Sequence, residues 1–174
     1  MVVLGLKRDM VRLFPHDPCW EIEFTLIKEE LLGIMGQDIL DVHHIGSTAI
    51  RTIPAKPILD IAVVIGDFEV LDSYLCPLKE RGYYHRQDHD KPDRRLFIRG
   101  TGDSRTHHLH FFRFDSPSLA DHLFFRDYLR SHPESASEYA RLKQDLAEKF
   151  PSDRERYTTG KESFIRKILA QNLR

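Results

Sequence analysis

The stretch "HHIGSTAIRTIPAKPILDIAVVI", residues 43 to 65, decides how this sequence folds. Its last part, residues 57–65, has the density of β-branched residues that is typical of a central strand covered on both faces. A single carboxylate, Asp60, lies within this apolar run. Because an ionised carboxylate in apolar surroundings is costly without a partner, we expect Asp60 to pair with a cation such as Lys56 or to face a cleft and hold a metal ion.

A Gly-Ser pair precedes this strand. Residues 39–45 alternate between the two faces of a predicted strand, and Gly46 and Ser47 follow it directly. Glycine lets an anion approach the backbone amides, and the hydroxyls of Ser47 and Thr48 add donors, so the turn can bind phosphate. The same pair is also a common turn, and the sequence leaves both interpretations open.

The composition limits the classes of partner. The 174 residues include 26 basic and 27 acidic side chains, a balance that favours neither a nucleic acid nor an anionic membrane as partner. Cys19 and Cys76 stand apart without a CxxC pattern, which argues against disulfides and thiolate zinc sites. Neither a signal segment nor a run of about 18 apolar residues is present, so we expect a soluble cytoplasmic protein.

The pattern predicts a mixed α+β fold. A helix is expected from Asp17 and Pro18 to Gly33 and Gly36, and a second over residues 68–84, kinked at Pro77, with Leu71, Leu75 and Leu78 inward. A short strand should cover residues 83–85. After it, residues 94–99 and 105–114 resemble the two strands of an antiparallel hairpin.

The C-terminal part is helical in pattern. Ser116 and Pro117 open a first helix, Pro133 opens a second, and a third begins at about Thr159. We therefore expect an α/β core over residues 1–115 and a helical segment over residues 116–174 that packs on it.

Histidines on the predicted hairpin are candidate ligands or bases. On a strand, His108 and His110 share one face and His107 lies on the other. The first two could complete a metal site with Asp60, or one could act as a general base near neutral pH. Alternatively, they stack on Phe112 and Phe114.

Basic residues could bind phosphate oxygens. The candidates are Lys56, Arg95 and Arg99, which share a strand face, and Lys161, which follows Gly160 near a helix start. A second set of charged residues is expected to form ion pairs that dock the helices on the sheet, namely Arg126, Asp127, Arg130 and Asp153.

The stretch "HHIGSTAIRTIPAKPILDI" resembles the signature of the GrpB family, which usually reads close to HIGSTAVPGLPAKPIIDI. The segments "RRLFIRG", "RTHHLHFF", "LFFRDYLRSHPESASEYARLKQDLA" and "DRERYTTGKESFI" are similar to later blocks of that family in the same order. The resemblance implies a nucleotidyltransferase-like mixed sheet flanked by helices. A similar domain is fused to dephospho-coenzyme A kinase in some bacteria, which implies a link with coenzyme A or nucleotides.

The GrpB family is similar to a branch of the nucleotidyltransferase superfamily, whose usual pattern is a Gly-Ser or Gly-Gly turn, an acid-hydrophobic-acid strand and a third acid on a later strand. Gly46, Ser47 and Asp60 match the turn and the first acid, but Ala62 stands at the second, and residues 107–114 contain no acid. Nucleotidyl transfer commonly uses two metal ions, which a single carboxylate cannot bridge.

We thus arrive at a hypothesis for the site. A divalent metal (Mg or Mn, with Zn possible) would bind Asp60, His108 and His110, which are also the candidate catalytic residues. Phosphates would contact Gly46, Ser47, Thr48, Lys56, Arg95, Arg99 and Lys161. The function would be transfer from a nucleoside triphosphate, the partner being a nucleotide or another phosphorylated small molecule. A non-catalytic module for nucleotides or coenzyme A derivatives and a zinc-dependent hydrolase are the alternatives.

Overall fold

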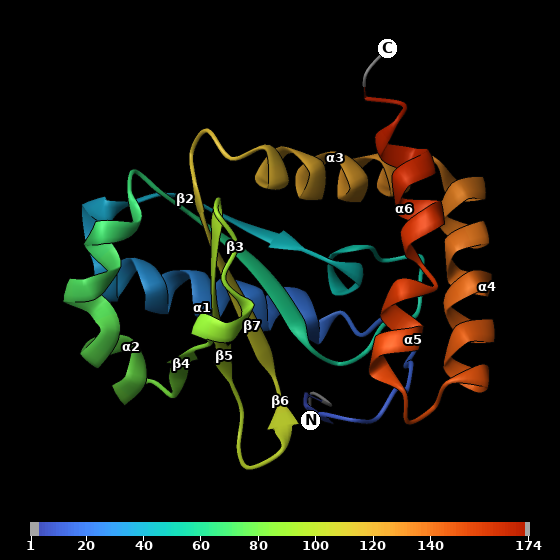
Figure 1. Cartoon of the computed structure of the whole chain (residues 1–174), viewed down its shortest axis with the longest axis horizontal. Coiled ribbons are helices and arrows are strands. Elements are labelled where there is room, and N and C mark those ends of the chain that lie inside the picture. Colours follow the sequence, from blue (N-terminus) through green and yellow to red (C-terminus); the bar gives the residue numbers. More distant parts are fainter. Residues whose placement is uncertain (1–3, 173–174) are drawn as a thin grey trace.

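A five-stranded mixed sheet organises the molecule (Figure 1). The computed structural model describes residues 4–172. Strand β3 pairs antiparallel with β2 and parallel with β7, and β7, β5 and β4 follow in antiparallel order. The strands are β2 (Ile39–Ile45), β3 (Leu59–Ile65), β4 (Tyr83–His85), β5 (Arg94–Arg99) and β7 (His107–Arg113). The mixed sheet with its flanking helices confirms the α+β class and the predicted hairpin of β5 and β7.

Strand β3 is covered on both faces, as its composition predicts. Leu59, Ile61 and their odd-numbered neighbours pack in one core cluster with helix α1 (Cys19–Met35). On the other face, Ala62 and Val64 pack against Leu119 of α3 (Pro117–Ser131).

The boundaries of α1 follow the capping pattern with one correction. The Asp17 carboxylate accepts a hydrogen bond from the Cys19 amide at 2.9 Å, which stabilises the first turn. Gly36, with a φ of 55°, ends the helix. Gly33 lies inside α1, so the prediction that it helps to end the helix is wrong.

The predicted helix over residues 68–84 is two shorter elements. A 3-10 segment, η3 (Phe68–Tyr74), leads into α2 (Leu75–Glu80). Pro77 lies in the first turn of α2, where its amide needs no helical acceptor, so it causes no kink. Leu71 and Leu78 are buried as predicted, whereas Leu75 is 38% exposed.

Four helices follow the sheet. The Ser116 hydroxyl caps α3 by accepting from the Leu119 amide, and Pro133 opens α4 (Pro133–Lys149). Two helices, α5 (Arg154–Thr159) and α6 (Glu162–Leu169), replace the predicted third one. Asp153 caps the extra helix α5 by accepting from the Arg156 amide at 3.0 Å.

The helical segment packs on the loop after the Gly-Ser pair. Ile50 and Ile53 share a core cluster with side chains of α3, α4 and α6. Arg126 and Arg130 form the expected ion pairs with Asp127. Their contacts with the core, however, go to backbone oxygens of His44 and Ala49, at 3.0 Å and 2.8–3.0 Å. None of the helices within residues 4–172 has the length and apolar character needed to cross a bilayer.

Candidate functional site

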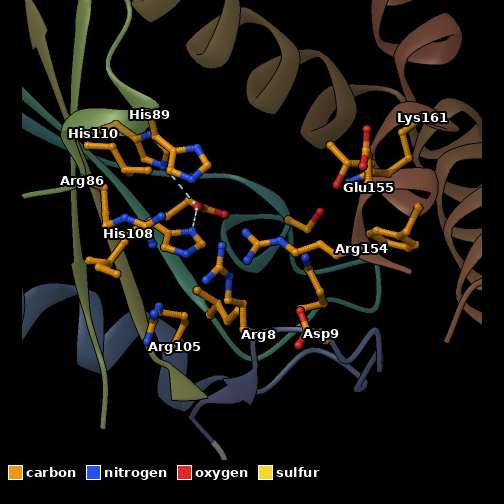
Figure 2. Close-up of a pocket in the computed structure, with 18 of the residues that line it drawn as sticks. Arg8, Asp9, Arg86, His89, Arg105, His108, His110, Arg154, Glu155 and Lys161 are labelled. Carbon is orange, nitrogen blue, oxygen red and sulfur yellow. Dashed lines mark hydrogen bonds and ion pairs between the residues drawn. The ribbon is translucent and has the colours of Figure 1, made fainter. Parts of the chain in front are cut away.

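A cavity of about 1100 Å³ opens between the sheet and the C-terminal helices (Figure 2). Its walls come from β3, β5, β7, the Gly-Ser turn, helix α5 and a two-stranded sheet of β1 (Leu6–Lys7) and β6 (Ser104–Arg105). Figure 2 shows His108 and His110 on one side of the cavity, Lys161 on the other, and Arg8 and Arg154 between them.

The Gly-Ser turn and the lone acid lie together. The register of β2 and β3 pairs Ile45 with Asp60, so Gly46 is next to the carboxylate. Gly46 has a φ of 69°, and a Cβ at this position would lie 2.6 Å from the Asp60 carboxylate. Glycine is therefore required here both by backbone conformation and by space. Ser47 and Thr48 line the cavity from the next turn, the 3-10 segment η2 (Ser47–Ala49).

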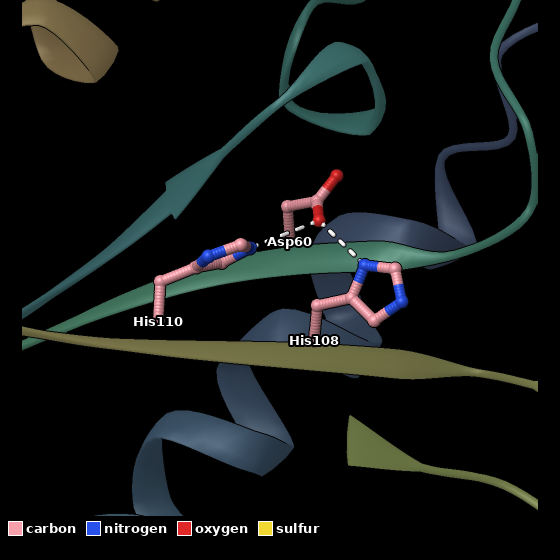
Figure 3. Close-up of side chains that lie close together, drawn as sticks. All are labelled: Asp60, His108 and His110. Carbon is pink, nitrogen blue, oxygen red and sulfur yellow. Dashed lines mark hydrogen bonds and ion pairs between the residues drawn. The ribbon is translucent and has the colours of Figure 1, made fainter. Parts of the chain in front are cut away.

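Asp60 is the centre of a three-residue cluster (Figure 3). Its Oδ1 lies 2.9 Å from His108 Nδ1 and 3.2 Å from His110 Nε2. The parallel pairing of β3 with β7 sets His108 opposite Asp60, and His110 two residues further on the same face. Within residues 4–172, the ion-pair partners of Asp60 are these imidazoles and not Lys56.

The protonation states suit metal ligation. Burial alone would raise the pKa of Asp60, but hydrogen bonds from His108 and His110 outweigh burial and hold that pKa well below its ordinary value. Burial lowers the pKa of His110, which favours its neutral form. An ionised carboxylate and a neutral imidazole are the forms that bind metals.

The cluster fits a divalent cation. Donor atoms of Asp60, His108 and His110 all lie within 4.8 Å of one another. A set of two imidazoles and one carboxylate suits zinc, iron or manganese better than magnesium. Ala62 is fully buried beside Phe112 and Leu119, so a carboxylate there would lie in apolar surroundings. His110 lies directly opposite Ala62 on the neighbouring strand.

Two predicted lysines lie in the cavity on the far side of Asp60. The ammonium groups of Lys56 and Lys161 lie 5.3 Å and 4.4 Å from the ring centroid of Tyr157. Burial, followed by the charges of Arg154 and Lys161, lowers the pKa of Lys56 to about 7. Burial lowers the pKa of Lys161 to about 8. Gly160 has a helical φ of −60°, and its role is to let Leu146 approach closely rather than to loosen the backbone.

Five arginines that were not among the predicted residues line the cavity. One of them, Arg86, pairs with Asp88 at 2.6 Å. The other four are Arg8, Arg94, Arg105 and Arg154. Within the described residues, neither these four nor Lys56 and Lys161 have a carboxylate within 4.0 Å. The Nε of Arg94 is buried without a partner. Among the described residues, seven arginines and lysines and four acids, Asp9, Asp60, Asp153 and Glu155, line the cavity, so it carries an excess of positive charge.

Arg95 and Arg99 do not reach the cavity, in contrast to the prediction. Leu96 and Ile98 line it, so the odd-numbered residues of β5 point to the opposite face. There the Arg95 guanidinium lies 4.2 Å from the Phe68 ring centroid, and Arg99 lies 3.5 Å from Glu30. Arg94, one position earlier, has the face that was assigned to Arg95. Arg95 and Arg99 share one face, as the period of two predicts. The apolar Phe97 between them lies on the same face and marks it as the core side.

The contacts of His44 and His107 are structural. His44 packs beneath the turn, where its Nε2 lies 2.9 Å from Thr48 Oγ1 and its ring stacks on Phe24. Burial lowers the pKa of His44 to about 4. His107 points away from Asp60, as predicted, and its Nε2 lies 3.4 Å from Glu23.

The sheet order and the turn beside Asp60 define a nucleotidyltransferase-like fold. A structure of Cid1 poly(U) polymerase with MgGTP superimposes with a TM-score of 0.54 at 10% identity, over 78% of this chain and 44% of that one. This similarity shows the fold alone.

The chain belongs to the GrpB family, whose model, described as GrpB protein, matches residues 10–171. A crystal structure of conserved protein GrpB from Enterococcus faecalis has a TM-score of 0.87 at 33% identity, over 93% of this chain and 97% of that one. Glutamate-rich protein GrpB of Alkalihalophilus pseudofirmus is 36% identical over 96% of this chain and 98% of its own length.

Other relatives are longer than this chain. UPF0157 protein YqkA of Bacillus subtilis is 37% identical over 93% of the chain, which spans about half, 49%, of that protein. A dephospho-CoA kinase of Mycobacterium tuberculosis is 28% identical over 92% of the chain and 45% of its own length. The family domain thus occurs alone and within longer proteins.

Proposed function

We propose that the cavity binds a nucleoside triphosphate with a divalent cation and transfers the nucleotidyl group to a hydroxyl of a second molecule. One observation carries this proposal. Asp60, with its two imidazoles and the Gly46 turn, lies in the same cavity as the half-buried Lys56 and Lys161, which have no carboxylate partner among the described residues. Triphosphates supply the negative charge that these cations lack.

Each group of the cavity has a role in this proposal. Asp60, His108 and His110 would hold the cation, which would polarise phosphoryl oxygens as a Lewis acid. Ser47 and Thr48 donate to phosphate oxygens from the turn. Lys56 and Lys161 neutralise the β- and γ-phosphates from the opposite wall.

The reaction balances without a further reactant. The acceptor oxygen forms a bond to the α-phosphorus, and the bond from that phosphorus to the oxygen of the β-phosphate breaks. Pyrophosphate leaves, and the hydroxyl proton passes to water in the open cavity. Lysines near the leaving group favour this direction because they stabilise the charge that develops on pyrophosphate.

A second candidate is a binding module without turnover. Ala62 favours it, because the fold's second acid is replaced by a fully buried methyl group. The two candidates share the ligand and differ only in product formation.

Calorimetry tests the ligand that both candidates share. ATP, GTP, CTP and coenzyme A are titrated with and without Mg²⁺, Mn²⁺ or Zn²⁺ into the wild type, Asp60→Asn, and the control Asp72→Asn at an exposed position outside the cavity. We expect one nucleotide to bind with a metal to the wild type and the control, and much less to Asp60→Asn. Equal binding by all three proteins would remove Asp60 from the site.

Product analysis separates the enzyme from the module. Labelled nucleotide is incubated with the protein, the metal and a fractionated cell extract. Release of pyrophosphate together with a labelled adduct, both absent with Asp60→Asn, supports transfer. Saturable binding without either product supports the module.

A further inference from the structure

The cavity has two separate cationic walls. The lysine wall, defined by Lys56 and Lys161, lies beside Tyr157. The arginine wall, defined by Arg8 and Arg105, comes from the sheet of β1 and β6. Figure 2 shows Arg8 and Arg105 at one end of the cavity and Lys161 at the other, with Arg154 between them. The proposed triphosphate site uses the lysine wall and leaves the arginine wall without a function.

We infer that the arginine wall is a second anion site, which holds the phosphate group of a phosphorylated small-molecule acceptor. This inference rests on the proposed function for the role of acceptor. The binding site itself stands on the position, the anchoring and the charge of Arg8 and Arg105.

The arginine wall is firmly anchored. The register pairs Leu6 with Arg105 and Lys7 with Ser104. The Gly5 amide donates to the Pro57 carbonyl at 2.8 Å, and the Arg8 amide donates to the Asp103 carbonyl at 2.9 Å. Pro57 immediately precedes the strand of Asp60, so these bonds fix the wall relative to the metal cluster.

Arg8 and Arg105 have no carboxylate within 4.0 Å among the described residues. Arg105 donates only to the backbone oxygens of Gly102 and Ser104, at 3.0 Å and 3.3 Å. Burial and the neighbouring charges of Arg8, Arg105 and Arg86 lower the pKa of Arg154, whereas Asp60 raises it. Guanidinium groups bind phosphate with two parallel hydrogen bonds, which lysine cannot do. A phosphate between these side chains would remove their mutual repulsion.

The cavity has room for two ligands. Its volume of about 1100 Å³ exceeds the ~300–1,000 Å³ of pockets that hold a single small molecule. The unpaired cations are gathered around this one cavity, and the whole chain has a formal charge of −1. A nucleic acid would instead require an exposed basic surface, so a small phosphorylated molecule fits better.

Inorganic pyrophosphate is the probe for both walls. It is titrated by calorimetry into the wild type, Arg8→Gln/Arg105→Gln and Lys56→Gln/Lys161→Gln. The control is Arg12→Gln/Arg141→Gln, at exposed positions outside the cavity. We expect two sites in the wild type and the control, and one in each cavity variant. Loss of the paired guanidinium contacts should weaken the affected site by about tenfold or more.

Metal-dependent binding of a non-hydrolysable ATP analogue is measured on the same proteins. Arg8→Gln/Arg105→Gln should bind the analogue like the wild type, and the lysine variant should not. Melting curves show whether each variant folds, and Arg8→Lys/Arg105→Lys replaces the arginine variant if that one unfolds, with a weakened second site expected.

Two results would overturn the inference. One is a single pyrophosphate site in the wild type. The other is that Arg8→Gln/Arg105→Gln weakens the binding of the ATP analogue as much as the binding of pyrophosphate. A different result separates the two proposals. If no nucleotide binds but pyrophosphate binding still depends on Arg8 and Arg105, the anion site is supported and nucleotidyl transfer is not.

Discussion

Charged side chains on the two faces of the hairpin of β5 and β7 differ in whether they have an ion-pair partner. On the face toward α1, Arg95, Arg99 and His107 lie 3.5 Å, 3.5 Å and 3.4 Å from Asp90, Glu30 and Glu23, respectively. On the cavity face, Arg94 and the cations of both walls have no carboxylate partner within the described part of the chain. Asp60, on the adjacent strand β3, already accepts from two imidazoles.

This difference distinguishes structural from functional charge. Paired charges on the far face satisfy each other and contribute to folding. Unpaired, partly buried cations on the cavity face cost stability unless a ligand supplies the counter-charge. The comparison predicts that substitutions on the two faces have opposite consequences for stability and for binding.

The largest loss of stability is expected from a charge at position 62, in the apolar part of the sheet. Ala62→Asp would place a carboxylate beside Phe112 and Leu119, where the side chain is fully buried. We expect a loss of about 3–5 kcal/mol of unfolding free energy, as for other uncompensated buried charges. Urea denaturation measures it, with Ala62→Ser as the small polar control. A stable Ala62→Asp protein with tighter metal binding would show that position 62 opens to the cavity.

A methyl group at Gly46 should affect both stability and the site. Gly46→Ala adds a Cβ at 2.6 Å from the Asp60 carboxylate and forces a non-glycine residue to a φ of 69°. The backbone strain costs about 1–3 kcal/mol, and displacement of Asp60 should reduce metal-dependent nucleotide binding.

The control for this substitution is Gly33→Ala, since a Cβ there meets nothing within 4 Å. Because alanine favours a helix over glycine by about 1 kcal/mol, Gly33→Ala should raise Tm and leave binding unchanged. Equal melting temperatures for the two alanine variants would contradict the close contact of Gly46 with Asp60.

Local patterns in the sequence were sufficient for part of the site. Gly46 directly follows β2 and Asp60 lies in β3, the strand that pairs with β2, and the periodicity of β7 places His108 and His110 on one face. Alternation also showed that Arg95 and Arg99 share a face. It could not show which face borders the cavity, and a choice that is wrong by one position exchanges every side chain between faces.

The arginines of the cavity could not be found from local patterns. Arg8 and Arg105 line the same cavity because β1 pairs with β6, and Arg154 lines it through the position of α5. Such contacts depend on tertiary packing between segments that are far apart in the sequence. The prediction of a single helix from Thr159 misses α5 for a related reason. It places Asp153 in an ion pair, whereas Asp153 caps the start of α5.

Neutralising one cation on each face tests the comparison directly. Arg99→Gln leaves Glu30, whose Oε1 is already buried without a hydrogen bond, with a weakened partner. We expect a loss of roughly 1–2 kcal/mol and unchanged nucleotide binding. Lys56→Met removes a half-buried cation from the cavity and should raise Tm while it weakens nucleotide binding.

Thermal melting and calorimetry on both variants give the result. The control is Arg141→Gln, which changes an exposed charge outside the cavity and should alter neither property. If both variants lose stability to the same extent, the two faces do not differ in the way that their ion pairs suggest.

The smallest effect should be a pH dependence that separates the two walls. The pKa values of Lys56, about 7, and Lys161, about 8, are lowered, so these side chains lose their protons as the pH rises from 6.5 to 8.5. The affinity of the lysine wall for an anion should therefore fall over this range. For each lysine that loses its proton, the fall is at most about tenfold per pH unit.

Without a bound anion, the free energy of unfolding should instead increase as the pH rises, because the unfolded chain keeps the lysine proton up to its ordinary pKa of 10.5. Sulfate is a suitable probe since its own charge is constant over this range. It should bind Arg8→Gln/Arg105→Gln more weakly at pH 8.5 than at pH 6.5, and it should bind Lys56→Gln/Lys161→Gln equally at both. A pH dependence of the same size in both variants would mean that a group outside the lysine wall titrates, and the two walls would then not be distinguished by charge.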